Sequence, residues 1–188
     1  MAIVVGVDGS AVAVSVLQAA IKEARLREAA LHVVHVVYVP VDFNTQTLEQ
    51  RLLDCGYNET LKTLFIWQGV TEYLTPQAVD ETLAFVHDHS APGSSIVFDY
   101  ADPTILKGAA KHGEVSSMRR YRHLSGETLV FGIPVDEAEA FLAARGFTAI
   151  ENADHGDLER AYFGNGKVPR KVADGYGIAS AVVPGPGA

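Results

Sequence analysis

The sequence predicts an α/β fold: a doubly wound, mostly parallel sheet of about six strands with helices on both faces. Short β-branched or aromatic runs alternate with helical patterns along the 188 residues, as they do in strands joined through crossover helices. Hydrophobic residues make up 48% of the chain and charged residues 20%, which is the composition of a globular domain. The length suits a single domain with one continuous core.

The first three elements are expected to be a strand, a helix and a strand. Residues 3–7 form a β-branched run, and residues 8–10 that follow have the pattern of a turn and a helix N-cap. From residue 11 to about residue 29, apolar side chains recur at steps of three and four, which predicts an amphipathic helix. Residues 31–39 are rich in valine and end at Pro40, which indicates a second strand.

Helices and strands continue to alternate over the rest of the chain. A short helix near residues 47–55 is expected to stop at Gly56, and Thr75 with Pro76 predicts the start of another, as N-cap and first-turn proline. Further strands are expected at 63–68, 95–100, 148–151 and 177–183, and a helix at 135–145 that ends at Gly146.

The charge balance favours a small-molecule ligand. The chain has 15 Lys and Arg against 23 Asp and Glu, a formal net charge of −8, so we expect neither a nucleic-acid nor a membrane partner. Cys55 is the single cysteine and cannot close an intrachain disulfide, and no secretory signal or membrane-spanning run is recognised. We therefore expect a cytoplasmic protein, and an exposed strand edge would allow a homodimer.

Ligands of doubly wound sheets bind at the carboxyl ends of the strands. In this chain those ends carry Asp8-Gly9, Asp42-Phe43, Gln68-Gly69-Val70 and Asp99-Tyr100. Helix capping is the alternative role for Asp8 and Asp99. The His pairs have the wrong spacing to chelate, and no zinc-type Cys/His pattern occurs, so no metal site is expected.

Five sequence blocks carry a resemblance to a known family. They read YVPVDF at 38–43, LFIWQGVTEYLT at 64–75, PGSSIVFDY at 92–100, FLAARGF at 141–147 and YGIASAVV at 176–183. In this order they resemble the later part of the leucine carboxyl methyltransferase-like family of S-adenosylmethionine-dependent enzymes, which O-methylate small molecules. The resemblance covers residues 38–183 and implies a Rossmann-like methyltransferase core.

The resemblance also implies which residues contact S-adenosylmethionine. Asp42 would accept a hydrogen bond from the adenine amine, and Phe43 would pack on the ring. Gln68 stands where the family places a glutamate that faces the cofactor, and its neutral amide is expected to weaken the binding of a cation. Gly69 and Val70 would let the strand end approach the ligand.

The methyl acceptor, a small-molecule hydroxyl or carboxyl, would be contacted by Tyr73, Asp99, Tyr100 and Arg119. Tyr73 has covering the core as its alternative role. Arg119 belongs to a basic cluster at 119–123, where the family has its substrate lid, and a solvated helix face is the alternative there. Methyl transfer needs no nucleophilic side chain, so no catalytic residue is assigned.

Residues 1–37 resemble a different family. The blocks IVVGVDGS at 3–10 and LHVVHVV at 31–37 are similar to the opening strand, helix and strand of universal stress proteins. In that family the Asp of the first block lies near a bound adenine, which implies Asp8. Gly6, Asp8 and Gly9 would otherwise form the loop that holds the methionine end of the cofactor.

Together the two resemblances predict one α/β domain that lacks one strand-helix unit of a methyltransferase. The strand at 38–43 would then pair directly with the strand at 3–7, and residues 184–188 would be a frayed tail. Three functions stay open: a methyltransferase acting on a small molecule, which we favour; a non-catalytic adenine-nucleotide-binding stress-type protein; and a truncated methyltransferase fold without activity.

Overall fold

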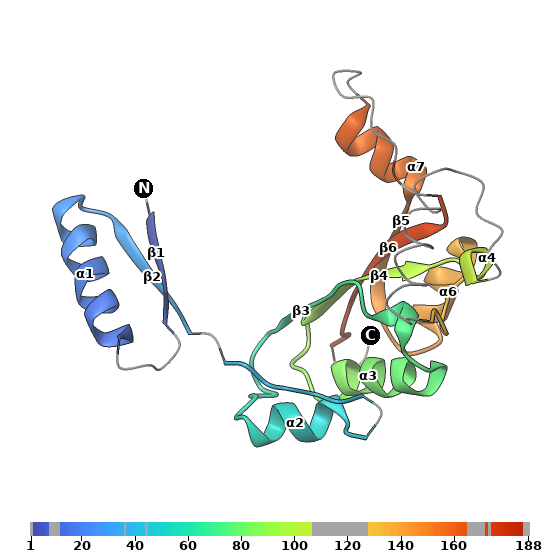
Figure 1. Ribbon diagram of the computed structural model, residues 1–188, viewed down its shortest axis with the longest axis horizontal. Coiled ribbons are helices and arrows are strands. Elements are labelled where there is room, and N and C mark those ends of the chain that lie inside the picture. Colours follow the sequence, from blue (N-terminus) through green and yellow to red (C-terminus); the bar gives the residue numbers. More distant parts are fainter. Residues whose placement is uncertain are drawn as a thin grey trace. The chain divides into compact units, whose positions relative to one another are not determined.

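The computed structural model describes residues 2–7, 12–35, 37–43, 45–106, 128–164, 172 and 174–185. The chain divides into two compact units, Met1–Pro40 and Val41–Ala188 (Figure 1). The described strands form two sheets, β1-β2 in the first unit and β3-β4-β6-β5 in the second.

The first unit is a parallel strand-helix-strand motif. Strand β1 (Ala2–Val7) pairs in parallel with β2 (Ala30–His35), and helix α1 (Ala13–Leu26) connects the two. Among its described side chains, Val5 and Ala24 are the buried hydrophobic ones. Val4, next to Val5 on β1, is 67% exposed, because neighbouring side chains of a strand point to opposite faces. This unit therefore buries very little apolar surface.

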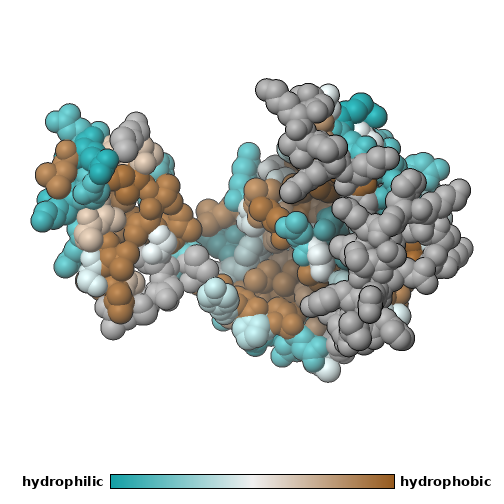
Figure 2. All heavy atoms as spheres, turned by 45° about the horizontal axis from the view of Figure 1, so that its top comes forward, coloured by the Kyte–Doolittle hydropathy of each residue, from teal (hydrophilic) through white to brown (hydrophobic). Residues whose placement is uncertain are grey.

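Apolar side chains are correspondingly common on the surface of the first unit. Figure 2 shows hydrophobic residues spread over it. The large hydrophobic side chains exposed there include Val12, Val14, Val33, Val34 and Leu26.

The second unit contains the four-stranded sheet. Strands β3 (Leu64–Trp67) and β4 (Ser95–Ala101) are parallel and are connected by helix α3 (Pro76–Asp88). Strand β6 (Tyr176–Val182) runs antiparallel to both β4 and β5 (Thr148–Asp154). The shorter helical segments are α2 (Leu48–Asp54), η1 (Thr71–Tyr73), α4 (Pro103–Leu106), η2 (Val135–Glu137), α6 (Ala138–Ala143), α7 (His155–Leu158) and η3 (Glu159–Phe163).

The core of the second unit lies on one face of its sheet. Ile96, Phe98 and Tyr100 alternate along β4 and are at most 1% exposed, as expected for the face of a strand that is covered. Residues of α3 at helical spacing, Val79, Leu83 and Val86, and Leu142 of α6 pack in the same cluster. The helices α3 and α6 thus contribute to the core formed with this face.

Several predicted boundaries are confirmed by local chemistry. The Thr75 hydroxyl accepts a hydrogen bond from the Ala78 N–H at 3.2 Å, and Pro76 occupies the first turn of α3. Gly146 follows α6 with a φ of +85°, a left-handed conformation that glycine adopts without strain. None of the helices in the described ranges is long and apolar enough to cross a membrane.

The prediction that 38–43 is a strand beside residues 3–7 is wrong. Residues 37–43 contain no strand, and the partner of β1 is β2. Pro40 lacks the N–H that a ladder needs. The chain then turns, because the Asp42 carbonyl accepts hydrogen bonds from the N–H groups of Thr45 and Gln46 at 3.0 and 2.8 Å.

The sheet itself also differs from the prediction. We expected one doubly wound, mostly parallel sheet of about six strands, whereas the six described strands lie in two sheets. In the larger sheet β3, β4 and β5 run in the same direction, as expected for a mostly parallel sheet, and β6 runs antiparallel to its neighbours β4 and β5. The antiparallel placement of β6 depends on pairing with β4, some 80 residues earlier in the chain, and the local pattern of a buried strand does not specify direction.

Candidate functional site

The candidate site is the turn at Gln68–Val70, where the parallel strands β3 and β4 end. Trp67 and Phe98 form the last paired position of the two strands, so Gln68 and Asp99 both follow it. Gly69 has a φ of +67°, in the region that favours glycine. Its N–H donates a hydrogen bond to Asp99 Oδ1 at 2.7 Å. A side chain of one strand therefore holds the turn that ends its neighbour.

The 3-10 turn η1 anchors the other end of this turn. The Thr71 hydroxyl, fully buried, donates to the backbone oxygen of Asp99 at 2.6 Å. The Glu72 carbonyl accepts hydrogen bonds from the N–H groups of Val130 and Phe131 at 2.8 and 3.2 Å. The backbone from residue 68 to residue 73 is thus fixed to β4 and to the segment at 130–131.

The turn leaves Gln68 and Gly69 open to a ligand. Both are exposed, and a Cβ placed on Gly69 would meet nothing within 4 Å among the described residues. The Gln68 amide forms no hydrogen bond with any described residue. An exposed amide, which both donates and accepts, therefore stands beside accessible backbone. Such an edge can bind a polar small molecule.

Trp67, directly before the turn, has an unusual indole. The side chain is 9% exposed, and its Nε1 is buried without a hydrogen-bond partner in the part of the chain that the structure describes. Its ring lies 6.1 Å from that of Phe98, centroid to centroid. Buried indole N–H groups usually find an acceptor, so this one adds a local cost of about 1–3 kcal/mol.

The two predicted tyrosines differ in their access to a ligand. Tyr100 is 0% exposed, and its hydroxyl donates to Asn152 Oδ1 at 2.7 Å. Burial raises the pKa of its phenol. The structure therefore places Tyr100 in the core, on the opposite face of β4 from Asp99, rather than at a surface that an acceptor molecule could reach. Tyr73 is 36% exposed and stays a candidate.

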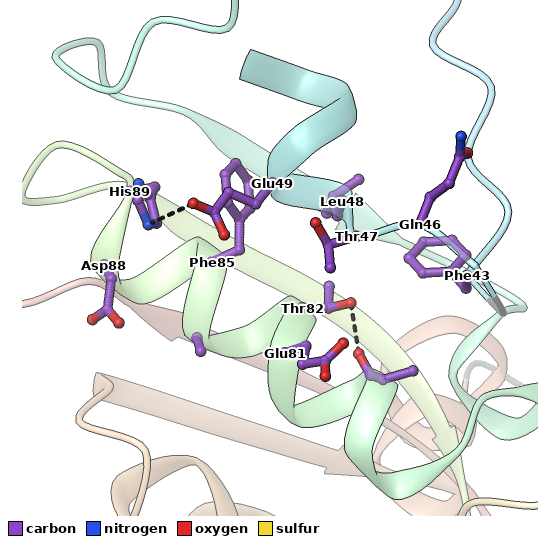
Figure 3. Close-up of a pocket in the computed structure, with 12 residues that line it drawn as sticks. Phe43, Gln46, Thr47, Leu48, Glu49, Glu81, Thr82, Phe85, Asp88 and His89 are labelled. Carbon is purple, nitrogen blue, oxygen red and sulfur yellow. Dashed lines mark hydrogen bonds and ion pairs between the residues drawn. The ribbon is translucent and has the colours of Figure 1, made fainter. Parts of the chain in front are cut away.

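Phe43, which directly follows Asp42, lies beside α3 (Figure 3). Asp42 is exposed, and its Oδ2 accepts a hydrogen bond from the Thr45 hydroxyl at 3.0 Å. Phe43 lines a pocket of about 210 Å³ between the segment at 43–49 and α3, and a neighbouring one of about 400 Å³. Gln68, Gly69 and Val70 line neither pocket, so the structure does not bring the two predicted sets of cofactor residues into one cavity.

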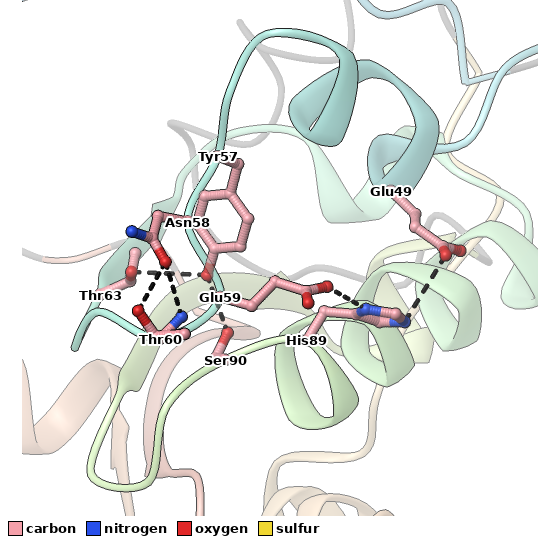
Figure 4. A network of polar contacts seen from close by, with 8 residues as sticks. All are labelled: Glu49, Tyr57, Asn58, Glu59, Thr60, Thr63, His89 and Ser90. Carbon is pink, nitrogen blue, oxygen red and sulfur yellow. Dashed lines mark hydrogen bonds and ion pairs between the residues drawn. The ribbon is translucent and has the colours of Figure 1, made fainter.

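Sequence reasoning missed a polar network at the end of α3 (Figure 4). His89 lies between two carboxylates: its Nδ1 contacts Glu59 and its Nε2 lies 3.6 Å from Glu49 Oε1. The imidazole stacks on Phe85, with ring centroids 5.5 Å apart. These contacts link α2 and the following loop to α3. Glu49 and Glu59 lie 40 and 30 residues before His89, so no local pattern signals the network.

Of the remaining predicted site residues, the structure describes Gly6. Gly6 in β1 is exposed and pairs with Val34. Asp8, Gly9 and Arg119 lie outside the described residues. Within the described ranges, no group of three or more His, Cys, Asp and Glu side chains is placed to hold a metal ion.

Parallel strands joined by a helix, with an open glycine turn at their carboxyl end, are typical of α/β proteins that bind small molecules. Sequence comparisons are more specific. Residues 15–87 match the family model of leucine carboxyl methyltransferase. The chain is also 32% identical over 148 residues, 78% of its length, to YktD of Bacillus subtilis (strain 168), which is named as an S-adenosyl-L-methionine-dependent methyltransferase. It spans 48% of that relative, about half its length. Both matches are to methyltransferases.

The comparisons do not support the resemblance of residues 1–37 to universal stress proteins. The methyltransferase family match begins at residue 15 and so includes most of α1 and all of β2. The short valine-rich strands that suggested the stress-protein opening occur at the start of many α/β folds, since buried parallel strands are apolar throughout. The comparisons thus favour neither the stress-type nucleotide binder nor an inactive truncated fold.

Two solved methyltransferase structures also align with most of the chain. The S-adenosylmethionine-dependent methyltransferase SibL, in its apo form, is 16% identical, with 98% of this chain and 44% of that one covered and a TM-score of 0.43. A SAM-dependent methyltransferase from Archaeoglobus fulgidus is 11% identical, with 86% and 80% covered and a TM-score of 0.45. With TM-scores below 0.5, neither structure establishes the fold of this chain.

Proposed function

We propose that the chain acts in the S-adenosylmethionine-dependent O-methylation of a small-molecule hydroxyl or carboxyl. The observation that carries the proposal is the open Gln68–Val70 turn at the carboxyl end of the parallel pair β3 and β4. The matches to methyltransferases support the choice of cofactor. The chain spans about half the length of YktD. That this chain carries out the complete methyl-transfer reaction is therefore also proposed.

The residues at the turn fit this cofactor. S-adenosylmethionine supplies, when bound, a methyl group activated by a sulfonium sulfur. Its amino-acid end and ribose need hydrogen-bond donors and acceptors, which the exposed Gln68 amide offers. Gly69 lets the backbone come close to a ligand, since no side chain of its own stands in the way.

The chain would contribute binding and orientation rather than a nucleophile. In-line transfer of a methyl group requires the acceptor oxygen to be held against the methyl carbon, and positioning supplies most of the rate. Tyr73, which is 36% exposed and lies in η1 just after the turn, is the proposed contact for the acceptor. In this proposal Asp42 and Phe43 contact the adenine from the segment beside α3.

The proposal also includes the setting in which the protein works. We propose a cytoplasmic location, no nucleic-acid or membrane partner, and self-association through an exposed strand edge. In the second unit, β3 is an edge strand with Leu64 59% and Ile66 72% exposed, a surface that can pair with another chain.

Gln68→Glu tests the proposed cofactor site. A carboxylate near the sulfonium should attract it, so the variant should bind S-adenosylmethionine about threefold to fivefold more tightly, the effect of roughly 0.6–1 kcal/mol from a partly exposed charge pair. S-adenosylhomocysteine, which lacks the sulfonium charge, should gain less. Isothermal titration calorimetry with both compounds and with ATP measures this.

Gln18→Glu is the matched control, because Gln18 is an exposed glutamine of α1 in the first unit. It should leave the ratio of the two affinities unchanged. Binding of ATP in the absence of any binding of the two cofactor compounds would contradict the proposed function. An equal response to Gln68→Glu and Gln18→Glu would remove Gln68 from the site.

A further inference from the structure

We propose that Asp99 is a positioning residue, which acts on the ligand only through Gly69 and keeps the Gln68–Val70 turn in its open conformation. This differs from the direct contact with substrate that the sequence predicts for Asp99. The inference rests on the proposed function for its effect on ligand binding, but its effect on the turn stands on the contacts of β4 alone.

The first step is the partner of the Gly69 N–H. Beyond Trp67 the β3–β4 ladder stops, so this backbone donor has no strand partner. Asp99 Oδ1 accepts it at 2.7 Å. Backbone N–H groups that lack a partner are costly, and a carboxylate is a stronger acceptor than a neutral group. The side chain of Asp99 thus replaces the missing bond of the ladder.

The second step is that Asp99 receives two bonds from the same turn. Its backbone oxygen accepts from the Thr71 hydroxyl at 2.6 Å, and its side chain accepts from Gly69. Val70 lies between these two donors and packs against the core. Asp99 therefore fixes the turn both at the left-handed Gly69 and at Thr71. Gln68, next to Gly69, stays exposed.

The third step is that Asp99 is separate from the core. It alternates with the buried Phe98 and Tyr100, so its side chain points to the other face of the sheet. Removing its carboxylate should release the turn and leave the packing of β4 intact. A loss of ligand binding can therefore be distinguished from a loss of folding.

The test compares Asp99→Ala with Asp99→Asn in the full chain. Asparagine keeps an acceptor oxygen for Gly69, whereas alanine removes it. In Asp99→Ala, amide hydrogen exchange at Gly69 should be at least tenfold faster and S-adenosylhomocysteine should bind at least tenfold more weakly. In Asp99→Asn, both values should stay within about threefold of the wild type. Asp136→Ala, at an exposed aspartate of η2, is the control and should change neither.

Each outcome decides the proposal. If Asp99→Ala leaves the exchange of Gly69 unchanged, the carboxylate does not hold the turn and the proposal is overturned. If both variants lose binding equally while exchange in Asp99→Asn stays normal, Asp99 contacts the ligand directly, which also overturns it. If the wild type does not bind S-adenosylhomocysteine, the proposed function fails, and the exchange of Gly69 still decides whether Asp99 positions the turn.

Discussion

The two units of the chain bury very different amounts of apolar surface. In the second unit, sixteen buried hydrophobic residues form one cluster, whereas Val5 and Ala24 are the buried hydrophobic residues described in the first. A two-stranded sheet with one helix has too few layers to exclude water from its own side chains. The cluster that supports the Gln68–Val70 turn is formed by residues of the second unit.

The helices of the two units differ in the same way. Helix α3 begins with a capping threonine and a first-turn proline, and five of its residues are buried, namely Val79, Thr82, Leu83, Phe85 and Val86. Helix α1 begins after Val12 without a side-chain capping bond and buries Ala24 alone among its residues. A ligand site needs a rigid support, and the buried cluster of the second unit supplies one.

The largest effect is expected from truncating the core of the second unit. Leu83→Ala removes a side chain that is 0% exposed and should lower the free energy of unfolding by about 2–5 kcal/mol. Leu26→Ala, at a leucine of α1 that is 71% exposed, should cost less than about 1 kcal/mol. Urea unfolding of both variants measures the difference. Equal losses in the free energy of unfolding would contradict the difference in burial between the two units.

A smaller effect is expected from adding a methyl group to glycines. In Gly177→Ala, the new Cβ would lie 2.5 Å from the Tyr100 phenol, which is buried and cannot move aside, so the cost should be about 1–3 kcal/mol. In Gly6→Ala, the Cβ meets nothing within 4 Å, and the change should stay within about 0.5 kcal/mol. Thermal unfolding ranks the two variants. A larger cost at Gly6 would contradict the open space around this glycine.

The smallest effect is expected in acid and concerns Asp102, which follows β4. Burial acts to raise the pKa of this carboxyl, but hydrogen bonds from the Thr104 hydroxyl and N–H and from the Val135 N–H outweigh it and hold the pKa below its ordinary value. The stability that Asp102 contributes is present above its unfolded pKa of about 3.9 and is lost as the pH falls through the lower folded value.

Asp102→Asn should therefore lose less stability than the wild type between pH 6 and pH 3, as measured by urea unfolding at both pH values. Glu23→Gln in α1 is the control for the first unit, since Glu23 pairs with Arg27 on the surface and such pairs contribute little. If the free energy of unfolding depends on pH identically in Asp102→Asn and in the wild type, Asp102 is not the source of the acid sensitivity.

Local patterns predict the elements of the chain well and their assembly less well. Thr75, Pro76 and Gly146 mark helix ends through their own backbone chemistry, so the sequence locates α3 and the end of α6. The valine-rich run at 31–39 is different. It predicts one long strand, but β2 ends at His35. The prediction was too long because composition alone does not show where a strand loses its pairing partner.

The candidate site likewise has local features that the sequence predicts and long-range contacts that it does not. Gln68, Gly69 and Val70 are found from the sequence because a strand end followed by glycine is a local feature. The role of Asp99 cannot be found in this way, since its hydrogen-bond partner Gly69 lies 30 residues away in the sequence. The alternation along β4 could have separated Asp99 from Tyr100, because adjacent residues of a strand cannot both face one ligand.

Trp67 gives the protein a built-in optical reporter. It is the chain's single tryptophan, it is shielded from water, and one peptide bond separates it from Gln68. All indole emission therefore originates at the foot of one short loop. The Trp67 Nε1 has no hydrogen-bond partner among the described residues. Any event that rearranges this loop, or that offers this Nε1 an acceptor, should shift the spectrum without a label being attached.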